Sequence, residues 1–419
     1  MEGIQETNKV RDKLAEEITS AIDNGSETVG DMRLIEAVLQ HGSSGNLMHV
    51  LRRGLNPCEE FNPEWVPSLS LDLGKGSNLL HAVVSLAIGK RSNRGKNRFA
   101  AASKLLTPSL QSSSDAELRF SDRKLVEAVV NFGGDPSLTD ESGNSPLHLV
   151  CSELKKRMNG TKKTTTVFEI IPGSDVEYLY NLAVLLATNG GSFDLQDSAK
   201  ETPISILASV GMYGETLAAQ MREDVHRMVG LSLDMIARSE NGDVSGVRKH
   251  LQNGVLAGYA DPDGHSALYF AVLQNKVQVV ELLLRNGANP THSLKDALGR
   301  NVLHTAMCRK DRDVESTHQR LEIIDMLIAH TKCYEAQDSL GHTAADIAQS
   351  EAENFLAVLV PLGKAGVILA DPKSDPSALD RLKDMANLAY IEHKNAFSEL
   401  MESRKAAVEA KTAQVRTFS

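Results

Sequence analysis

Hydrophobic and polar positions follow their clearest pattern in residues 261–290. An apolar stripe there has the i, i+3, i+4 spacing of a helix face, with Leu268, Ala271 and Val272 as its members. Asp261 and Gly264 predict a turn before this helix, and Ser266 is suited to cap its N-terminus. The pattern therefore predicts a turn followed by a short amphipathic helix.

A second apolar run follows directly after Asn275, which interrupts the first helix. Its members are Val277, Val279, Val280, Leu282, Leu283 and Leu284. Asn286 and Gly287 come next in the position of a C-cap, so a second helix should end there. A pair of helices this short cannot bury so apolar a second member alone, and we expect a copy of the pair on each side.

Copies of this unit occur on both sides. A shift of 33 residues toward the N-terminus aligns Val244, Val247, Leu251 and Gly254 with Val277, Val280, Leu284 and Gly287. Toward the C-terminus, the segment 299–304 repeats the spacing of 264–269, and an apolar run at 323–328 repeats the second helix after a longer gap. A repeat period of this length is typical of stacked helical units.

The unit resembles the ankyrin repeat, whose signature is a turn with Asp and Gly followed by Thr-Pro-Leu-His and a small residue. The closest copy consists of Asp140, Gly143, Ser145, Pro146, Leu147 and His148. Similar copies begin at Gly76, Asp197, Asp261 and Asp338, and the resemblance covers residues 31–363. It implies an all-α ankyrin-repeat solenoid of about eight units, with capping helices at both termini and long inserts in several repeats.

The repeats and inserts divide the chain into four segments. These are an N-terminal helical cap at 1–30, repeats one to four at 31–228 with inserts at 88–121 and 152–175, repeats five to eight at 229–363, and a C-terminal segment at 364–419. The last segment combines a linker with a long amphipathic helix predicted at 377–412, since no Gly or Pro occurs there. This helix could fold back as a cap or pair with another chain. The second helix of repeat four is blurred, which predicts a seam in the stack near 211–231.

Composition narrows the class of protein. The chain has 419 residues, of which 41% are hydrophobic and only 4% aromatic, as stacked small helices would have. A net charge of −10 argues against a protein built mainly to coat nucleic acid. The four cysteines have no metal or disulfide spacing, and there is no signal peptide or transmembrane stretch, which predicts a cytoplasmic protein.

No combination of residues indicates catalysis, a metal or a cofactor. His81, His148 and His304 occupy the Leu-His position, where the resemblance implies hydrogen bonds between neighbouring turns. Asp261, Asp263 and His265 only faintly resemble a calcium loop, because the closing Glu is missing, and we interpret them as a turn. We therefore expect a protein that is not an enzyme and has no cofactor.

The resemblance implies that a protein partner, of unknown identity, binds the concave surface formed by turn tips and outward positions of each first helix. Carried over residue by residue, the partner-binding positions are Glu141, Ser142, Asn144, Ser152, Glu153, Pro262, Asp263, His265, Leu273, Gln274, Ala297, Leu298, Arg300, Cys308 and Arg309. The expected function is that of a protein interaction scaffold or adaptor. An effector of an intracellular microbe that acts on host proteins is an alternative.

The inserts suggest a second alternative, the binding of nucleic acid or another anionic surface. They contain the basic residues Lys90, Arg91, Arg94, Lys96, Arg98, Lys155, Lys156, Arg157, Lys162 and Lys163. All inserts, including a third at 309–319, enter between the two helices of a repeat, so the resemblance places them along one edge of the solenoid. We expect either solvated mobile loops or a positively charged edge.

Overall fold

The structure is a computed structural model. It describes residues 28–29, 32–41, 44–52, 55–61, 75–97, 123–160, 174–291, 298–308, 313–331, 336–350, 360–361 and 376–417, with isolated residues between 16 and 26 and at 73. These residues form two compact units, Met1–Leu233 and Asp234–Ser419. The described part is all-α except for a small antiparallel hairpin of β1 (Thr28–Val29) and β2 (Met32–Arg33). The all-α prediction missed this hairpin, which is too short to leave an alternating pattern.

The first unit begins with paired helices and ends in a long one. Its helices are α2 (Leu34–His41), α3 (Ser44–Arg52), α4 (Leu79–Asn97), α7 (Pro146–Gly160), α8 (Asp175–Thr188), α9 (Pro203–Ala208) and most of α10 (Met212–Asn241). Residues 123–131 are also helical. Helix α7 packs on α4, α8 and α9, so the first helices of successive repeats stack on one another. The core of this stack contains fully buried leucines, among them Leu147, Leu154, Leu179, Leu182 and Leu186.

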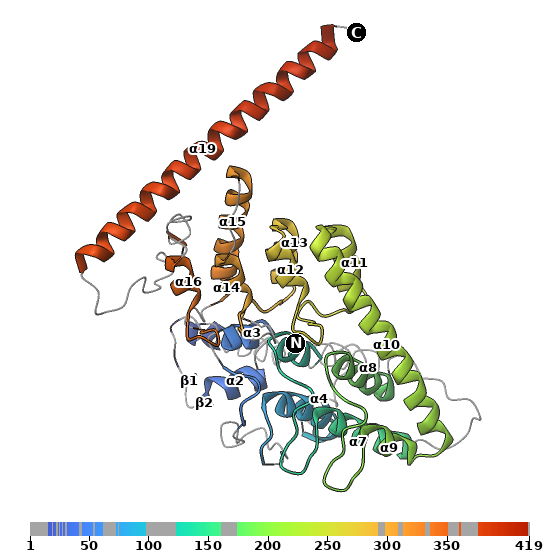
Figure 1. The fold of residues 1–419 in the computed structure, drawn as a ribbon. Helices are drawn as coiled ribbons and strands as arrows, with labels where there is room; N and C mark the ends of the chain where they lie inside the picture. The colour runs from blue at the N-terminus through green and yellow to red at the C-terminus, as the bar shows by residue number, and fades with distance from the viewer. Residues whose placement is uncertain are drawn as a thin grey trace, which may run out of the picture. The chain divides into compact units, whose positions relative to one another are not determined.

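The second unit repeats the same arrangement. Its helices are α11 (Val244–Gln252), α12 (Ala267–Leu273), α13 (Val277–Arg285), α14 (Val302–Met307), α15 (Val314–His330), α16 (Ala344–Ser350) and α19 (Pro376–Thr417). Helices α12, α14 and α16 pack in one row, and α11, α13 and α15 pack in a second (Figure 1). Leu268, Val280, Leu283, Ile324 and Leu327 are fully buried between these rows.

The predicted pair at 261–290 forms with the expected ends. The side chain of Ser266 accepts a hydrogen bond from the Tyr269 N–H and caps α12. Asn275 has a positive φ of 53° and separates α12 from α13. Asn286 is the C-cap of α13, as predicted. Local spacing was therefore sufficient to place both helices.

Two inserts were wrongly predicted to be loops over their first residues. Helix α4 continues from Leu79 through Asn97, ten residues into the insert at 88–121. Helix α7 likewise continues through Gly160, and α8 already begins at Asp175. Lys and Arg have good helix propensity, so a basic run directly after an established helix can extend it. The rest of both inserts lies outside the described residues.

Helix α10 crosses the predicted seam without a break. It has 30 residues and includes Gly230, and it extends from the predicted fourth repeat into the predicted fifth. The boundary between the two compact units lies within it, after Leu233. No break in secondary structure therefore marks the seam predicted near 211–231, because the weak apolar spacing of this segment did not show that one helix continues through it.

Other predicted elements are described only in part. The N-terminal helix lies almost entirely outside the described residues, although Ile18 is buried. The C-terminal helix is present as α19, with 42 residues. The number of eight units and the capping roles remain predictions. None of the described helices has the combination of length and hydropathy needed to cross a lipid bilayer.

Candidate functional site: the turn tips and first helices

Four turns before the first helices share one hydrogen-bonding pattern. In each, the Oδ1 atom of an Asp accepts hydrogen bonds from the backbone N–H groups two and four residues later, at 2.8 to 3.0 Å. The four residues are Asp140, Asp197, Asp261 and Asp338. Because the carboxylate fixes the backbone locally, the two residues after each Asp are held at the tip of the turn.

Backbone hydrogen bonds connect neighbouring tips. The Glu141 N–H donates to the Lys75 carbonyl at 2.7 Å, and the Ser198 N–H donates to the Ser142 carbonyl at 2.8 Å. In the second unit the Ser339 N–H donates to the Leu298 carbonyl at 2.8 Å. Each unit thus holds its tips in register.

Three buried histidines connect the start of a first helix to the next turn. The Nε2 atom lies 2.9 Å from the Asn144 carbonyl oxygen for His81, 3.3 Å from that of Glu201 for His148 and 3.1 Å from that of His342 for His304. Burial lowers the pKa of His81 and of His304, so both imidazoles are neutral near pH 7. The structural role predicted for these histidines is confirmed.

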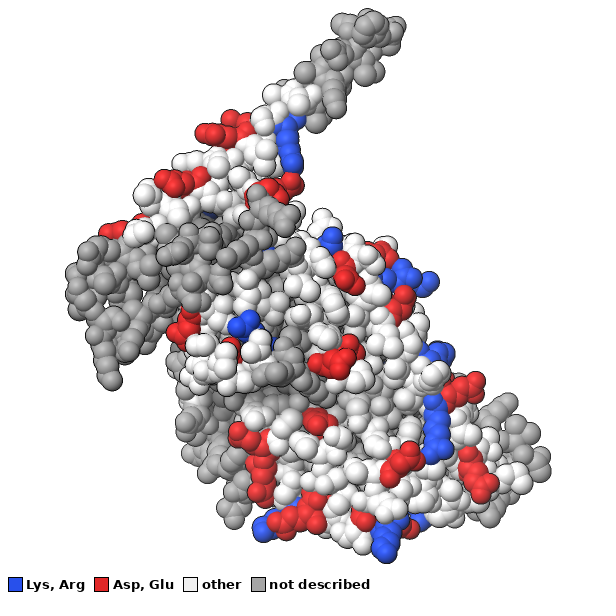
Figure 2. All heavy atoms as spheres, viewed as in Figure 1, with Lys and Arg blue, Asp and Glu red and all other residues white. Residues whose placement is uncertain are grey.

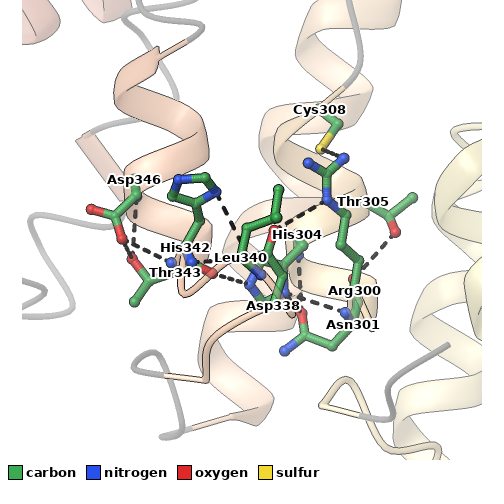
Figure 3. Close-up of polar contacts among 10 residues, drawn as sticks. All are labelled: Arg300, Asn301, His304, Thr305, Cys308, Asp338, Leu340, His342, Thr343 and Asp346. Carbon is green, nitrogen blue, oxygen red and sulfur yellow. Dashed lines mark hydrogen bonds and ion pairs between the residues drawn. The ribbon is translucent and has the colours of Figure 1, made fainter. Parts of the chain in front are cut away.

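Arg300, which precedes α14, extends this network to the turn before α16. Its Nε lies 3.5 Å from Oδ2 of Asp338, and its Nη1 lies 3.3 Å from Sγ of Cys308 (Figure 3). The backbone N–H groups of His342 and Leu340, with help from Arg300, hold the pKa of Asp338 below its usual range. Arg300 therefore helps to hold these two neighbouring turns together, and it is also a predicted partner contact. This ion pair joins positions 38 residues apart, so no local pattern could have indicated it.

The predicted partner-binding positions differ in exposure. The exposed ones are Glu141, Ser142, Pro262, Asp263 and Gln274. The half-buried ones are Asn144, Ser152, Glu153, His265, Leu273, Leu298, Arg300 and Cys308. Ala297 and Arg309 lie outside the described residues. For all of these positions, contact with a partner remains a prediction.

In the predicted sixth repeat, residues 261–290, three rings gather where the turn meets α12. The ring centroids of His265, Tyr269 and Phe270 are 5.2 to 5.5 Å apart, and all three side chains are half-exposed. Asp261 and Asp263 lie beside them. One carboxylate oxygen of each Asp and one ring nitrogen of His265 lie within 4.8 Å of one another. The sequence analysis did not select Tyr269 and Phe270, although their place one turn after the tip could have indicated them.

The predicted basic edge is only partly visible. Lys90, Arg91, Arg94 and Lys96 belong to α4, whereas Arg98, Lys162 and Lys163 lie outside the described residues. Lys155, Lys156 and Arg157 lie on α7, as does Glu153.

Acidic partners offset part of the α7 charge. Arg157 pairs with Glu153 at 2.8 Å and with Asp175 at 3.3 Å, and Lys156 lies 3.5 Å from Glu153. On the face drawn in Figure 2, acidic and basic side chains of the described residues are interspersed. Glu153 and Asp175 thus offset part of the charge of Lys156 and Arg157, and the positively charged edge remains a prediction.

Helix α19 contacts α15 within the second unit. Phe397 stacks on His318 with ring centroids 3.6 Å apart and planes 11° from parallel. Arg404 forms a bidentate ion pair with Glu315 at 2.8 and 3.0 Å. Burial, followed by the nearby His318, lowers the pKa of His393, which lies in the same contact. The structure thus gives α19 a defined contact with α15. Whether α19 caps the stack or pairs with another chain remains a prediction.

Comparison with known proteins supports the repeat assignment. A family model described as ankyrin repeats, in three copies, matches residues 235–316. The match begins in α10 and extends into α15, so it includes the turn and ring cluster described above. A search of curated proteins found no match to the chain.

Proposed function

We propose that this protein is a non-catalytic interaction scaffold or adaptor, because residues 235–316 match a family model of ankyrin repeats and proteins with such repeats generally bind other proteins. The partner binds the surface made by the turn tips and the outward positions of the first helices. The observation that carries this proposal is that backbone hydrogen bonds join neighbouring tips within each unit, from Glu141 to Lys75 and Ser198 to Ser142 in the first and from Ser339 to Leu298 in the second.

The chemistry of the tips supports binding rather than catalysis. The turn carboxylates accept backbone hydrogen bonds, and the buried histidines bond to carbonyl groups of the next turn. These groups hold the scaffold in shape and leave the outward side chains, such as Asp263 and Gln274, to contact a partner. We further propose a reducing, cytoplasmic-type compartment, because the four cysteines are far apart in sequence.

The test compares two sets of substitutions in the full chain. Asp263→Ala with Gln274→Ala removes outward side chains from the sixth repeat, and Gln220→Ala with Glu223→Ala removes exposed side chains from α10 as a control. Proteins captured by the wild-type chain are quantified by mass spectrometry, and the main partner is then purified for affinity measurement. We expect the first variant to bind that partner at least about five-fold more weakly, as loss of about 1 kcal/mol would produce, and the control to bind normally. If the variant with Asp263→Ala and Gln274→Ala binds the partner as tightly as the wild-type chain does, the proposal is contradicted.

The alternative of an anionic ligand bound by the basic inserts predicts a different result. Binding would then fall steeply as salt is added, and substitution of Lys90, Arg91 and Arg94 by Ser would remove most of that dependence. The ion pairs of Arg157 weaken this alternative for α7. A role as an effector of an intracellular microbe concerns the source of the partner and uses the same protein-binding surface.

A further inference from the structure

The ring cluster of the sixth repeat has a geometry suited to a cation. His265 and Tyr269 are tilted by 39°, His265 and Phe270 by 44°, and Tyr269 and Phe270 meet edge to face at 75°. None of the three pairs is stacked face to face, and all three side chains are half-exposed. Aromatic faces attract cations because the ring quadrupole is negative there.

Local hydrogen bonds fix the backbone that carries these rings. Asp261 accepts hydrogen bonds from the backbone N–H groups of Asp263 and His265 at 3.0 and 2.8 Å, which sets the direction of the turn. Ser266 caps α12, so Tyr269 and Phe270 are held in its first turns. The backbone that carries the three rings is thus held in place before a partner binds.

Carboxylates supply the complementary charge. The side chain of Asp263 is exposed, and Asp261 lies 3.4 Å from the His265 ring through its Oδ2 atom. A divalent metal would need several oxygen or nitrogen ligands, but Oδ1 of Asp261 already accepts two backbone hydrogen bonds. Aromatic rings do not ligate such an ion, whereas they do bind guanidinium and ammonium groups.

We propose that His265, Tyr269, Phe270 and Asp263 form an anchor for an Arg or Lys side chain of the protein partner. This inference rests on the proposed function, since it names the chemistry of the partner residue that the same surface receives. The cationic head lies over the rings, and the Asp263 carboxylate pairs with it at the exposed rim.

The experiment uses a small probe and the full chain. Nα-acetyl-arginine amide is titrated into the isotope-labelled protein and followed by amide NMR signals, with Nα-acetyl-citrulline amide as an uncharged probe of the same shape. We expect saturable shifts confined to residues 261–274 with the arginine probe and at least about five-fold weaker binding of the citrulline probe. Equal binding of both probes, or arginine shifts located elsewhere, would overturn the inference.

Variants separate the rings from the carboxylate. Phe270→Leu keeps apolar volume but removes a π face, and Asp263→Asn keeps shape but removes charge; each should weaken arginine binding by about three-fold or more. Gln278→Ala, an exposed change on α13, serves as a control and should leave it unchanged. The spectra themselves show whether each variant is folded.

Titration with Mn²⁺ tests a metal ion as the rival ligand. Broadening of the amide signals of residues 261–265 without an arginine response would assign the cluster to a metal. If the partner protein binds normally to both the Phe270→Leu and the Asp263→Asn variants, this inference fails while the proposed function stands.

Discussion

At the scale of single residues, the stack depends on backbone positions that come very close to one another. Gly143 has a φ of +78°, and a Cβ built there would lie 2.9 Å from the Cα of Asp197 in the next turn. Gly133 has a similar φ of +88° but no atom within 4 Å of such a Cβ. Alanine substitutions at these two glycines therefore separate the free-energy cost of the positive φ from the cost of the close approach to Asp197.

Gly143→Ala should destabilise the first unit more than Gly133→Ala. The positive φ alone costs about 1 kcal/mol in either variant, and the contact with Asp197 adds a clash in the first. Urea unfolding followed by circular dichroism gives both free energies of unfolding. Equal values would mean that the Ser142 to Ser198 contact between tips does not restrain the turn.

The buried histidines predict acid sensitivity. The pKa values of His81 and His304 are lowered in the folded chain, so the unfolded chain binds more protons near and below its own histidine pKa of about 6.5. Stability is fully present above that pH and is lost as the pH falls toward the folded pKa values. The melting temperature should therefore fall between pH 7.5 and 5.5.

Two substitutions check the source of this acid sensitivity. His304→Gln should reduce the pH dependence, whereas His226→Gln, on the exposed side of α10, should not. A pH dependence unchanged by His304→Gln would assign it to other groups.

At the scale of elements, spacing predicted short helices well and long ones poorly. The ends of α12 and α13 followed from Ser266, Asn275 and Asn286, all of which are local signals. Helix α10 and the extensions of α4 and α7 carry no sharp apolar period, so tertiary packing decides their length. The ring cluster likewise joins a turn to a helix, and only the fold brings its members together.

Helix α13 should be essential for its neighbours. It packs on α11, α12 and α15, and Leu283 at its centre is fully buried. Leu283→Asp would bury an unpaired charge at a cost of several kcal/mol, and more than one repeat should unfold. The exposed Gln278→Asp is the matched control. A wild-type circular dichroism melt for Leu283→Asp would refute the stacking assignment.

At the scale of the whole molecule, α19 is much larger than its contact on α15. Among the described side chains of α19 only Ala386 is buried, whereas Met385, Leu388, Ile391 and Met401 are 48 to 58% exposed. Its ion pair through Arg404 lies at the surface and contributes little. The helix thus presents apolar side chains available for another chain.

Deletion of residues 376–419 should leave the melting temperature nearly unchanged and alter the oligomeric mass. Light scattering should give the full chain a mass above that of one 45.4 kDa chain and the shortened chain the mass of a monomer. A large loss of stability with no change in mass would make α19 a cap of the stack.

The continuity of α10 also affects the order in which the chain folds while the ribosome synthesises it. The first unit ends at Leu233, but the helix that completes it ends at Asn241. Domains generally fold as units while the chain is still being synthesised, with the N-terminal one first. Because a helix gains stability cooperatively along its length, α10 is not yet complete when Leu233, the last residue of the first unit, emerges. Its completion waits until the opening residues of the second unit have been translated.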